Sequence, residues 1–401
     1  MRFLCKQFVP LLLVLLVSTA CFAQLPEKTP EQQLILALTS IKSQQLDLAM
    51  QQLQTLVKAK PDFKLAQLVY ADVMLAKAQG IMKVGETLKQ NKVLEGFLAE
   101  ATKRWHSAQN PVNANLLPAA LLSLDQEYQY AVVVELNNSR LHLFENENGV
   151  PKEIDNYYVS MGKSGPYKQF EGDNRTPLGV YFIENFLSPK TLPDKYGEGA
   201  FPLNYPNEWD DRLGKTGYGI WLHGTPLDTY SRPPRDSEGC VVLSNSDLQT
   251  VGGYLQLRRT PFVIADNINW LEKDKWLQQK QYFTTLISSW LTDWQSLDTN
   301  RYIQHYSKSF KSGQSNFLTW YSHKKRVNKN KTFIQVKTDD LSILKHPKDD
   351  ILVVTFRQHY KSDNYSSVSY KRQYWKQEKD GHWRIIFEGR VREPDQLLTQ
   401  L

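Results

Sequence analysis

The spacing of apolar residues changes twice along this 401-residue chain and divides it into three regions. From residue 29 to about residue 110 the apolar side chains recur every three or four positions, which is the period of helices that bury one face. From Tyr130 the apolar segments are short and are separated by glycine and proline, which indicates strands joined by turns. From Trp276 an amphipathic helix is followed by long strands of alternating polarity.

We therefore expect a multidomain α+β protein with an N-terminal helical region, a central β-rich domain and a C-terminal α+β domain. The expected boundaries are 24–125 for the helical region, 126–270 for the central domain and 275–401 for the C-terminal domain. The apolar content of 41 % is enough to give each part a core.

Residues 1–23 have the anatomy of a secretory signal peptide. Positive charge near the start is followed by an apolar run and then by small residues before Ala23. We expect cleavage there and a mature protein in the periplasm or the cell envelope. Lipid attachment at Cys21 is the alternative, although Ser18 stands where a lipoprotein signal normally has leucine or valine. No later segment approaches the roughly 18 uninterrupted apolar residues of a membrane-spanning helix.

The formal net charge of +7 favours an anionic environment such as a cell-wall polymer or a membrane surface. Charge alone does not choose between these surfaces. The basic residues are dispersed and no nucleic-acid-binding motif is present, so we expect no binding to nucleic acid.

Removal of the leader would leave Cys240 as the only cysteine, because Cys5 and Cys21 lie within the leader. Exported proteins normally use cysteines in disulfide pairs, so a single one is either a small buried residue or a reactive thiol. Its neighbours favour the reactive thiol. Gly239 lets the backbone N–H groups approach a bound carbonyl, and His223 lies 17 positions earlier. A nearby imidazolium would lower the pKa of the thiol and supply a nucleophilic thiolate.

The stretch from His223 to Asn245 resembles the signature of the YkuD-type L,D-transpeptidases. That signature is a histidine followed by glycine and, some fifteen residues later, by serine-x-glycine-cysteine, here SEGC at residues 237–240. Two upstream blocks also agree with it: GDNRTPLGVYFI, which begins at Gly172, and GYGIWLHGT, which begins at Gly217. The resemblance covers about 140 residues of the central domain, and three blocks in the right order make it specific.

The resemblance implies a β-sandwich-like catalytic domain that acts on the stem peptides of bacterial peptidoglycan. Cys240 would attack the carbonyl of the residue at stem position three, release the terminal D-amino acid and leave a thioester. His223 would take the thiol proton and return it to the leaving amine, while the backbone carbonyl of Gly224 would orient its ring. Backbone N–H groups of Gly239 and Cys240 would form the oxyanion hole. The chemistry requires no metal and no organic cofactor.

The chain departs from the family pattern at two positions. Glu238 replaces a histidine that many members have, and Val242 replaces an arginine that often meets a substrate carboxylate. Arg232 and Arg235, in the loop between the catalytic pair, could supply that positive charge, and the alternative is that both are solvated loop residues. The substrate-binding candidates are Ser237, Glu238, Tyr218, Arg232 and Arg235.

Three alternatives stay open at this stage. A zinc site made of His223, Glu238 and Cys240 has suitable ligand types, but structural zinc sites normally have four ligands at tighter spacing. A non-enzymatic cell-wall-binding module is the second, although the catalytic pair is intact. Within the enzyme class, an amine acceptor gives transpeptidation, which we expect, whereas water gives L,D-carboxypeptidase or amidase activity. A wall-attached protein is a further candidate acceptor.

The flanking regions carry two other resemblances. Residues 47–78 are similar to one tetratricopeptide unit, which indicates a packing module that would join a homodimer or a protein partner through the N-terminal helices. The region after Trp276 resembles the nuclear-transport-factor-like (SnoaL-type) α+β cone with a curved antiparallel sheet, and family members with such a cone include carboxypeptidases. Its His305, His359 and His382 have no acid or nucleophile near them in sequence, so we expect none of them to form a site.

Overall fold

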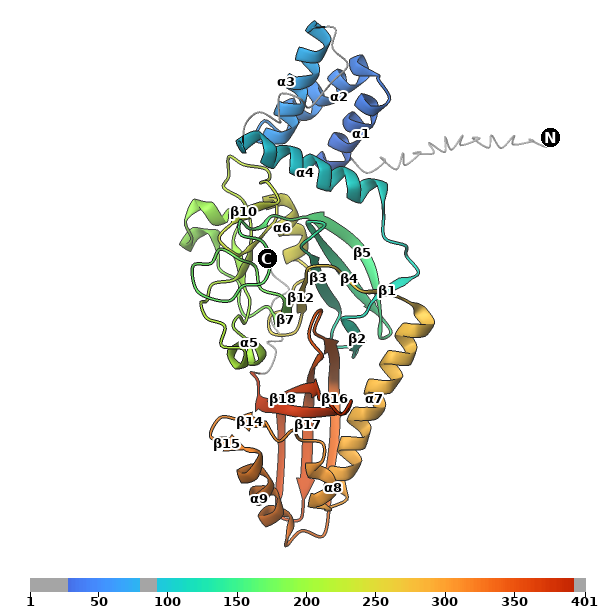
Figure 1. The fold of residues 1–401 in the computed structure, drawn as a ribbon, viewed down its shortest axis with the longest axis vertical. Helices are drawn as coiled ribbons and strands as arrows, with labels where there is room; N and C mark the ends of the chain where they lie inside the picture. The colour runs from blue at the N-terminus through green and yellow to red at the C-terminus, as the bar shows by residue number, and fades with distance from the viewer. Residues whose placement is uncertain (1–27, 80–91, 393–401) are drawn as a thin grey trace, which may run out of the picture.

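The computed structural model describes residues 28–79 and 92–392, so the expected leader lies outside the described part. Three parts are stacked along the long axis of the molecule, with a helical module at one end, a β-rich domain in the middle and an α+β domain at the other end (Figure 1). This is the expected fold class. No helix within the described ranges is both long and apolar enough to cross a membrane.

Four helices form the N-terminal module: α1 (Pro30–Lys42), α2 (Leu46–Ala59), α3 (Lys64–Gln79) and α4 (Lys92–Gln109). The first begins at a capping box in which Thr29 and Gln32 bond to each other's backbone N–H groups. The helices pack around a core that includes Leu34, Leu53 and Phe63. Tyr230 of the central domain is also part of this core, so the module and the middle of the molecule are packed together.

The main sheet of the central domain has the order β5-β4-β3-β12-β7. Its strands are β3 (Tyr130–Glu135), β4 (Arg140–Glu147), β5 (Val150–Tyr158), β7 (Gly179–Phe182) and β12 (Pro261–Ala265). β3 and β4 form a hairpin, since they pair antiparallel with Glu135 opposite Arg140. The last strand, β12, runs parallel to β3 and antiparallel to β7.

A second sheet, with the order β11-β9-β8, packs against one face of the main sheet through a shared apolar core. Smaller elements connect the two sheets. The elements of this half are β6 (Met161–Gly162), η2 (Pro189–Thr191), η3 (Asp194–Tyr196), β8 (Ala200–Pro202), α5 (Glu208–Arg212), β9 (Trp221–His223), β10 (Arg235–Ser237), β11 (Val241–Val242) and α6 (Asn245–Gly252).

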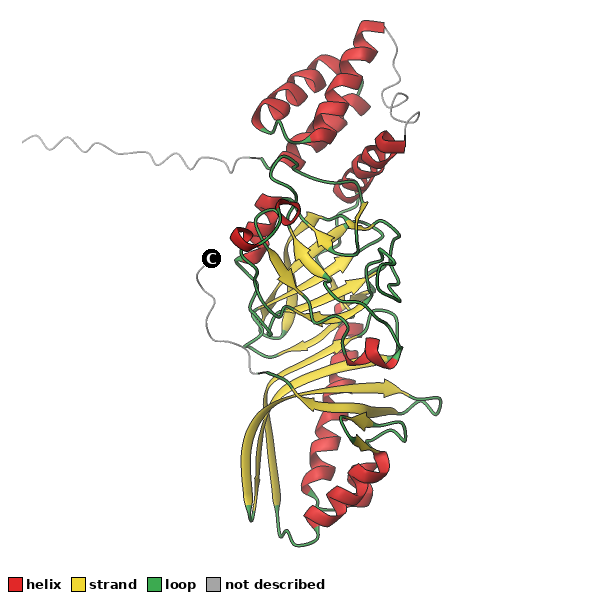
Figure 2. Cartoon of the chain, turned by 90° about the vertical axis from the view of Figure 1, so that its left-hand side faces the viewer, coloured by secondary structure: helices red, strands yellow, loops and turns green. Residues whose placement is uncertain are grey.

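The C-terminal domain is a long helix and several short elements packed on a curved antiparallel sheet, as Figure 2 shows. Its core is rich in aromatic side chains, including Trp290, Phe356 and Trp375. Its elements are α7 (Lys273–Gln295), α8 (Thr299–Ile303), β14 (Lys311–Ser312), β15 (Ser315–Asn316), α9 (Phe317–Asn328), β16 (Ile334–Lys345), β17 (Ile351–Ser362), β18 (Tyr365–Gln377) and β19 (Trp383–Arg390).

The segment after the helices differs from the expectation that the helical region extends to residue 125. The helices end at Gln109, and two strands follow, β1 (Leu116–Pro118) and β2 (Leu121–Leu124). The first pairs with β13 (Trp270–Glu272), and the second is the edge strand of the C-terminal sheet beside β16. Both runs are too short for a stable helix, and their partners lie far away in sequence, so local spacing does not reveal the pairing.

The central and C-terminal domains share one apolar core. The face of the main sheet that carries Val133 and Val263 packs on Val353 and Ile386 of the C-terminal sheet. Polar contacts add to it, since Arg212 donates to the backbone carbonyl of Ile386 at 2.7 Å. The catalytic candidates lie on the other side of the main sheet, in and around the smaller sheet.

Candidate active site

The expected catalytic pair is brought to one face of the smaller sheet by the pairing of β9 with β11. These strands run parallel, with Leu222 opposite Val241 and His223 opposite Val242. Leu222 and Val241 are buried in the central core. Because successive side chains of a strand point to opposite faces, His223 lies on the other face, and so does Cys240, which directly precedes β11.

The ring of His223 is oriented by the backbone next to it. Its Nδ1 lies 2.6 Å from the carbonyl oxygen of Gly224, and because a carbonyl only accepts, Nδ1 carries the proton and Nε2 is left free as a base. The ring also packs edge-on against Tyr196 at 5.0 Å. Burial lowers the pKa of His223 to about 4, opposed by the Gly224 hydrogen bond and assisted by the charges of Arg232 and Lys195. The imidazole is therefore neutral at pH 7.

The thiol of Cys240 is half-buried and free. It donates a hydrogen bond to the carbonyl oxygen of Gly219 at 3.4 Å. Burial raises its pKa to about 11, although a backbone hydrogen bond at Trp221 and the charge of Lys195 act in the opposite direction. We expected an imidazolium that lowers the pKa of the thiol, and this is wrong for the resting site. Both reacting groups are neutral because both lose hydration.

The SEGC turn places the thiol. Ser237 Oγ accepts a hydrogen bond from the N–H of Gly239 at 3.1 Å and donates one to the carbonyl oxygen of Cys240 at 2.7 Å. Gly239 has φ +127°, and a Cβ there would lie 2.8 Å from the carbonyl oxygen of Arg175, so only glycine fits. Ser237, expected to bind substrate, is buried and shapes the turn instead. It also occupies the Gly239 N–H that we assigned to the oxyanion hole.

The GDNRTP block supports this turn through hydrogen bonds from Thr176. Thr176 Oγ1 donates to the carbonyl oxygen of Gly239 at 3.0 Å and accepts from the N–H of Gly162 at 2.9 Å. Asp173 of the same block pairs with the buried Lys168 at 2.9 Å. A hydrogen bond thus joins two blocks that are about sixty positions apart in sequence, next to the residue that carries the thiol.

Asn245, the last residue of the motif, connects the loops around the histidine. Its Nδ2 donates to the carbonyl oxygen of Thr225 at 2.9 Å, and its Oδ1 accepts from the N–H of Glu198 at 3.0 Å. A Cβ on Gly224 would lie 2.1 Å from that Oδ1. The motif therefore requires glycine after His223, because the amide of Asn245 fills the space.

The other substrate-binding candidates lie nearer the solvent. Tyr218 is 79 % exposed, Arg235 is exposed, and Glu238 extends outward to 3.7 Å from Lys195. Arg232 is half-buried, and its charge acts on His223. Among these candidates, the charge of Arg232 lowers the pKa of His223, and the charge of Glu238 raises the pKa of Cys240.

Lys195 is a site residue that the sequence did not reveal. It lies in η3, stacks over Tyr196 at 5.0 Å and affects the pKa of both His223 and Cys240. No sequence motif marks it, since it comes from a loop 28 positions before the histidine. Val242, which replaces the family arginine, is buried and adds no charge.

The structure also bears on the zinc alternative and on the C-terminal histidines. Within the described ranges, no group of three or more histidine, cysteine, aspartate or glutamate residues is arranged to hold a metal ion. His305 and His359 have acidic partners in the fold, Asp293 at 2.8 Å and Asp339 at 3.0 Å. Those partners lie 12 and 20 positions earlier in the chain, so proximity in sequence does not reveal them.

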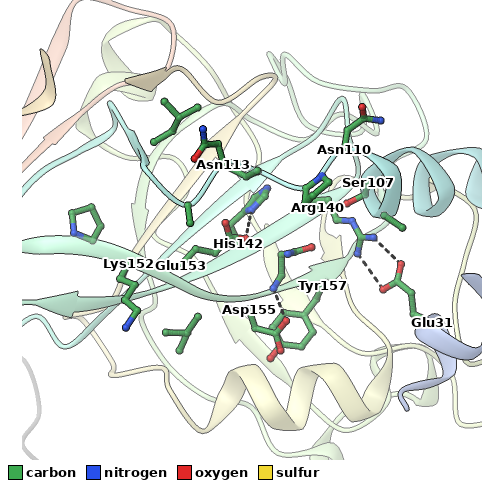
Figure 3. Close-up of a pocket in the computed structure, with 18 of the residues that line it drawn as sticks. Glu31, Ser107, Asn110, Asn113, Arg140, His142, Lys152, Glu153, Asp155 and Tyr157 are labelled. Atoms are coloured by element: carbon green, nitrogen blue, oxygen red, sulfur yellow. Dashed lines mark hydrogen bonds and ion pairs between the residues drawn. The ribbon is translucent and has the colours of Figure 1, made fainter. Parts of the chain in front are cut away.

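A groove of about 1440 Å³ lies away from the catalytic pair, between α1, the segment 107–117 and strand β5. Figure 3 shows Glu31 paired with Arg140 at one end of it and Glu153 bonded to His142 along its floor. Tyr230, from the loop between the catalytic residues, also contributes to its wall. The groove therefore borders the loop between His223 and Cys240 at Tyr230 and borders the helical module at α1.

Two family models match the chain. Residues 129–264 match the L,D-transpeptidase catalytic domain, and residues 282–389 match the Cds6 C-terminal NTF2-like domain. Helices α1 to α4 lie outside both matches. No curated protein matches the chain.

Solved structures with both domains are similar to this chain. Bd1075 from Bdellovibrio bacteriovorus is 32 % identical, with a TM-score of 0.63, over 70 % of this chain and 100 % of that one. The helical cell shape determining protein Pgp2 from Campylobacter jejuni is 26 % identical, with a TM-score of 0.55, over 71 % of this chain and 98 % of that one. The similarity thus extends across two domains and not only across the motif.

Proposed function

Because this chain belongs to the YkuD-type L,D-transpeptidase family and carries a C-terminal NTF2-like domain, we propose that it cleaves peptidoglycan stem peptides through a thioester at Cys240. The observation that carries the proposal is the placement of Cys240 and His223 on one face of the β9–β11 pair. The carbonyl of Gly224 leaves Nε2 of the histidine free to take a proton.

Acylation starts from two neutral groups. Nε2 of His223 takes the proton of the thiol as the sulfur of Cys240 bonds to the carbonyl carbon at stem position three. The carbonyl oxygen becomes negative and is stabilised by the backbone N–H of Cys240, because the N–H of Gly239 already donates to Ser237. The bond from that carbon to the terminal D-amino acid then breaks, and the imidazolium protonates the leaving amine.

The second half-reaction restores the enzyme. An acceptor attacks the thioester carbon, His223 takes the proton of the acceptor, and the sulfur of Cys240 leaves and recovers a proton. The loop from Thr225 to Glu238 would form the wall of an acceptor groove. We propose an amine as the acceptor, as the signature predicts, which makes the overall reaction a transpeptidation.

L,D-carboxypeptidase activity, with water as the acceptor, is the second candidate. The observation that favours it is the two-domain similarity to Pgp2, a cell shape determining protein. Removing the terminal residues of stem peptides limits later cross-linking. A carboxypeptidase could therefore change cell shape by changing how far the wall is cross-linked. Val242 also leaves the site without the usual arginine for a carboxylate. Hydrolysis of the bond to a wall-attached protein would be the amidase form of the same chemistry.

Incubation of the purified protein with a defined tetrapeptide muropeptide and an excess of a free D-amino acid tests the proposal. A cross-linked dimer, or exchange of the terminal residue for the added one, supports transpeptidation. Tripeptide as the only product identifies a carboxypeptidase and rules out the transpeptidase. Unchanged tetrapeptide, from protein whose thiol is shown to be intact, would contradict both.

We also propose that the protein acts in the cell envelope after export. The support is the leader expected at residues 1–23 and the location of the substrate. A fusion of the first 30 residues to a reporter enzyme that is active only outside the cytoplasm tests this proposal. A reporter retained in the cytoplasm would contradict it.

A further inference from the structure

The helical module holds the loop between the catalytic residues. At the corner before α3, the carbonyl oxygen of Asp62 accepts a hydrogen bond from the N–H of Tyr230 at 3.1 Å. The rings of Phe63 and Tyr230 lie 4.5 Å apart, and Lys64 Nζ donates to Thr229 Oγ1 at 3.2 Å. Three consecutive residues of the module thus contact two consecutive residues of the loop.

A buried cluster of charged residues from α4 and α1 binds the next loop residue, Ser231. Ser231 Oγ donates to Glu100 Oε1 at 2.6 Å, and Arg104 binds the same oxygen at 2.9 Å and Glu31 at 3.1 Å. Glu100 is 0 % and Arg104 is 2 % exposed. Removing charges from water is costly unless they are paired with good geometry. We call Ser231, Glu100, Arg104 and Glu31 the latch.

The latch is connected to the catalytic histidine. The guanidinium of Arg104 stacks on Tyr158 at 3.9 Å, and the hydroxyl of Tyr158 donates to the carbonyl oxygen of Arg232 at 2.9 Å. Arg232 directly follows the latched serine, and its charge acts on His223. The position of this loop thus determines where a positive charge lies relative to the general base.

We propose that the helical module positions the catalytic loop, with Ser231 and Glu100 as positioning residues that set the rate at which Cys240 is acylated. The inference rests on the proposed function and extends it, because neither family model includes the module. A loop held only at its two ends, by β9 and β10, would sample many positions, and small misplacements of a group beside the reacting atoms are costly.

Ser231→Ala tests the latch with little risk to folding, because it removes one hydroxyl and leaves the buried ion pairs in place. We expect kcat for release of the terminal D-amino acid, per titratable Cys240 thiol, to fall about tenfold, with KM within about twofold. Glu100→Gln should have a similar effect, and the double variant should be little worse than either single one. Glu95→Gln is the matched control, since Glu95 is exposed on the same helix, and it should behave as wild type.

The rate at which iodoacetamide alkylates Cys240 is the second readout and requires no substrate. We expect Ser231→Ala to change it by at least about threefold while the melting temperature stays within a few degrees. Wild-type kcat per thiol and wild-type alkylation in Ser231→Ala would overturn the proposal, as would an equal loss in Glu95→Gln. If the wild type releases no D-amino acid, the proposed function fails, and alkylation alone decides on the latch.

Discussion

Burial moves the pKa values of Cys240 and His223 apart, the first to about 11 and the second to about 4. The transfer of a proton from the thiol to the imidazole is therefore uphill in the resting site. A bound substrate would make it favourable by bringing a carbonyl carbon to the sulfur and N–H donors to the developing charge. On the proposed mechanism, such a site keeps the thiol unreactive until the substrate binds.

The pH dependence of alkylation tests this description of the pair. Below its pKa the thiolate fraction rises tenfold per pH unit, so the rate of alkylation of Cys240 should rise about tenfold per unit from pH 7 to pH 10. In the urea-unfolded protein, where the pKa is near its ordinary value, the rate should level off above about pH 9. A plateau between pH 6 and pH 8 in the folded protein would instead indicate a resting ion pair.

The sequence was sufficient to select Cys240 and His223 as the candidate catalytic pair, with a backbone group to orient the histidine. Cys240, His223 and the carbonyl of Gly224 all lie within or beside a motif. In the structure the carbonyl of Gly224 orients the ring of His223, and the β9–β11 pairing puts Cys240 on the same face as His223. Ser237 could not be assigned, because a serine that binds substrate and one that shapes a turn look alike in sequence. Lys195 was invisible, because its proximity to the pair depends on the tertiary fold.

At the scale of elements, the motif blocks hold one another in place through buried hydrogen bonds. Thr176 of the GDNRTP block bonds to both Gly239 and Gly162, and its side chain is fully buried. Without its hydroxyl, one backbone N–H and one carbonyl would lose a partner in the core. The order of the blocks in the sequence therefore reflects packing as well as chemistry.

Thr176→Val should lower the free energy of unfolding by about 2–4 kcal/mol, because it keeps the shape of the side chain but leaves two buried groups unpaired. Urea unfolding measures this change. Thr176→Ser retains the hydroxyl and should lose clearly less. A valine variant within about 0.5 kcal/mol of wild type would show that the hydroxyl does not hold the turn.

Helices and hairpins with strong local patterns were predictable, whereas pairings between distant segments were not. The hairpin of β3 and β4 follows from alternation around a turn. The addition of β2 to the C-terminal sheet does not, because Leu124 and its partner Ser342 are more than 200 positions apart. Nothing in a four-residue strand specifies such a partner.

At the scale of the whole molecule, the central and C-terminal domains are expected to unfold together. They share an apolar core that includes Val133 and Val353, and Arg212 spans the boundary by donating to the carbonyl oxygens of Lys311 and Ile386. Cooperative unfolding is the usual result of one continuous core.

Two probes in a urea titration test this prediction. Tryptophan fluorescence reports mainly on the C-terminal core, which contains Trp290, Trp294, Trp375 and Trp383. Alkylation of Cys240 reports on the central domain. The two transitions should coincide in the wild type. Arg212→Ala should lower the free energy of unfolding by about 1–3 kcal/mol and shift both urea midpoints down together. Lys379→Ala, at an exposed position of the C-terminal domain, should leave both unchanged. Two separated transitions in the wild type would contradict a shared core.

The central claim is that Cys240 carries out covalent chemistry on a stem peptide, and the rate of release of the terminal D-amino acid tests it most directly. Wild type and folded Cys240→Ala are incubated with the same tetrapeptide muropeptide, and the free D-amino acid is quantified over time. We predict that the alanine variant is slower by on the order of 10³-fold or more, because no other group described at the site replaces the thiol. Release at the wild-type rate by Cys240→Ala would contradict the thioester mechanism.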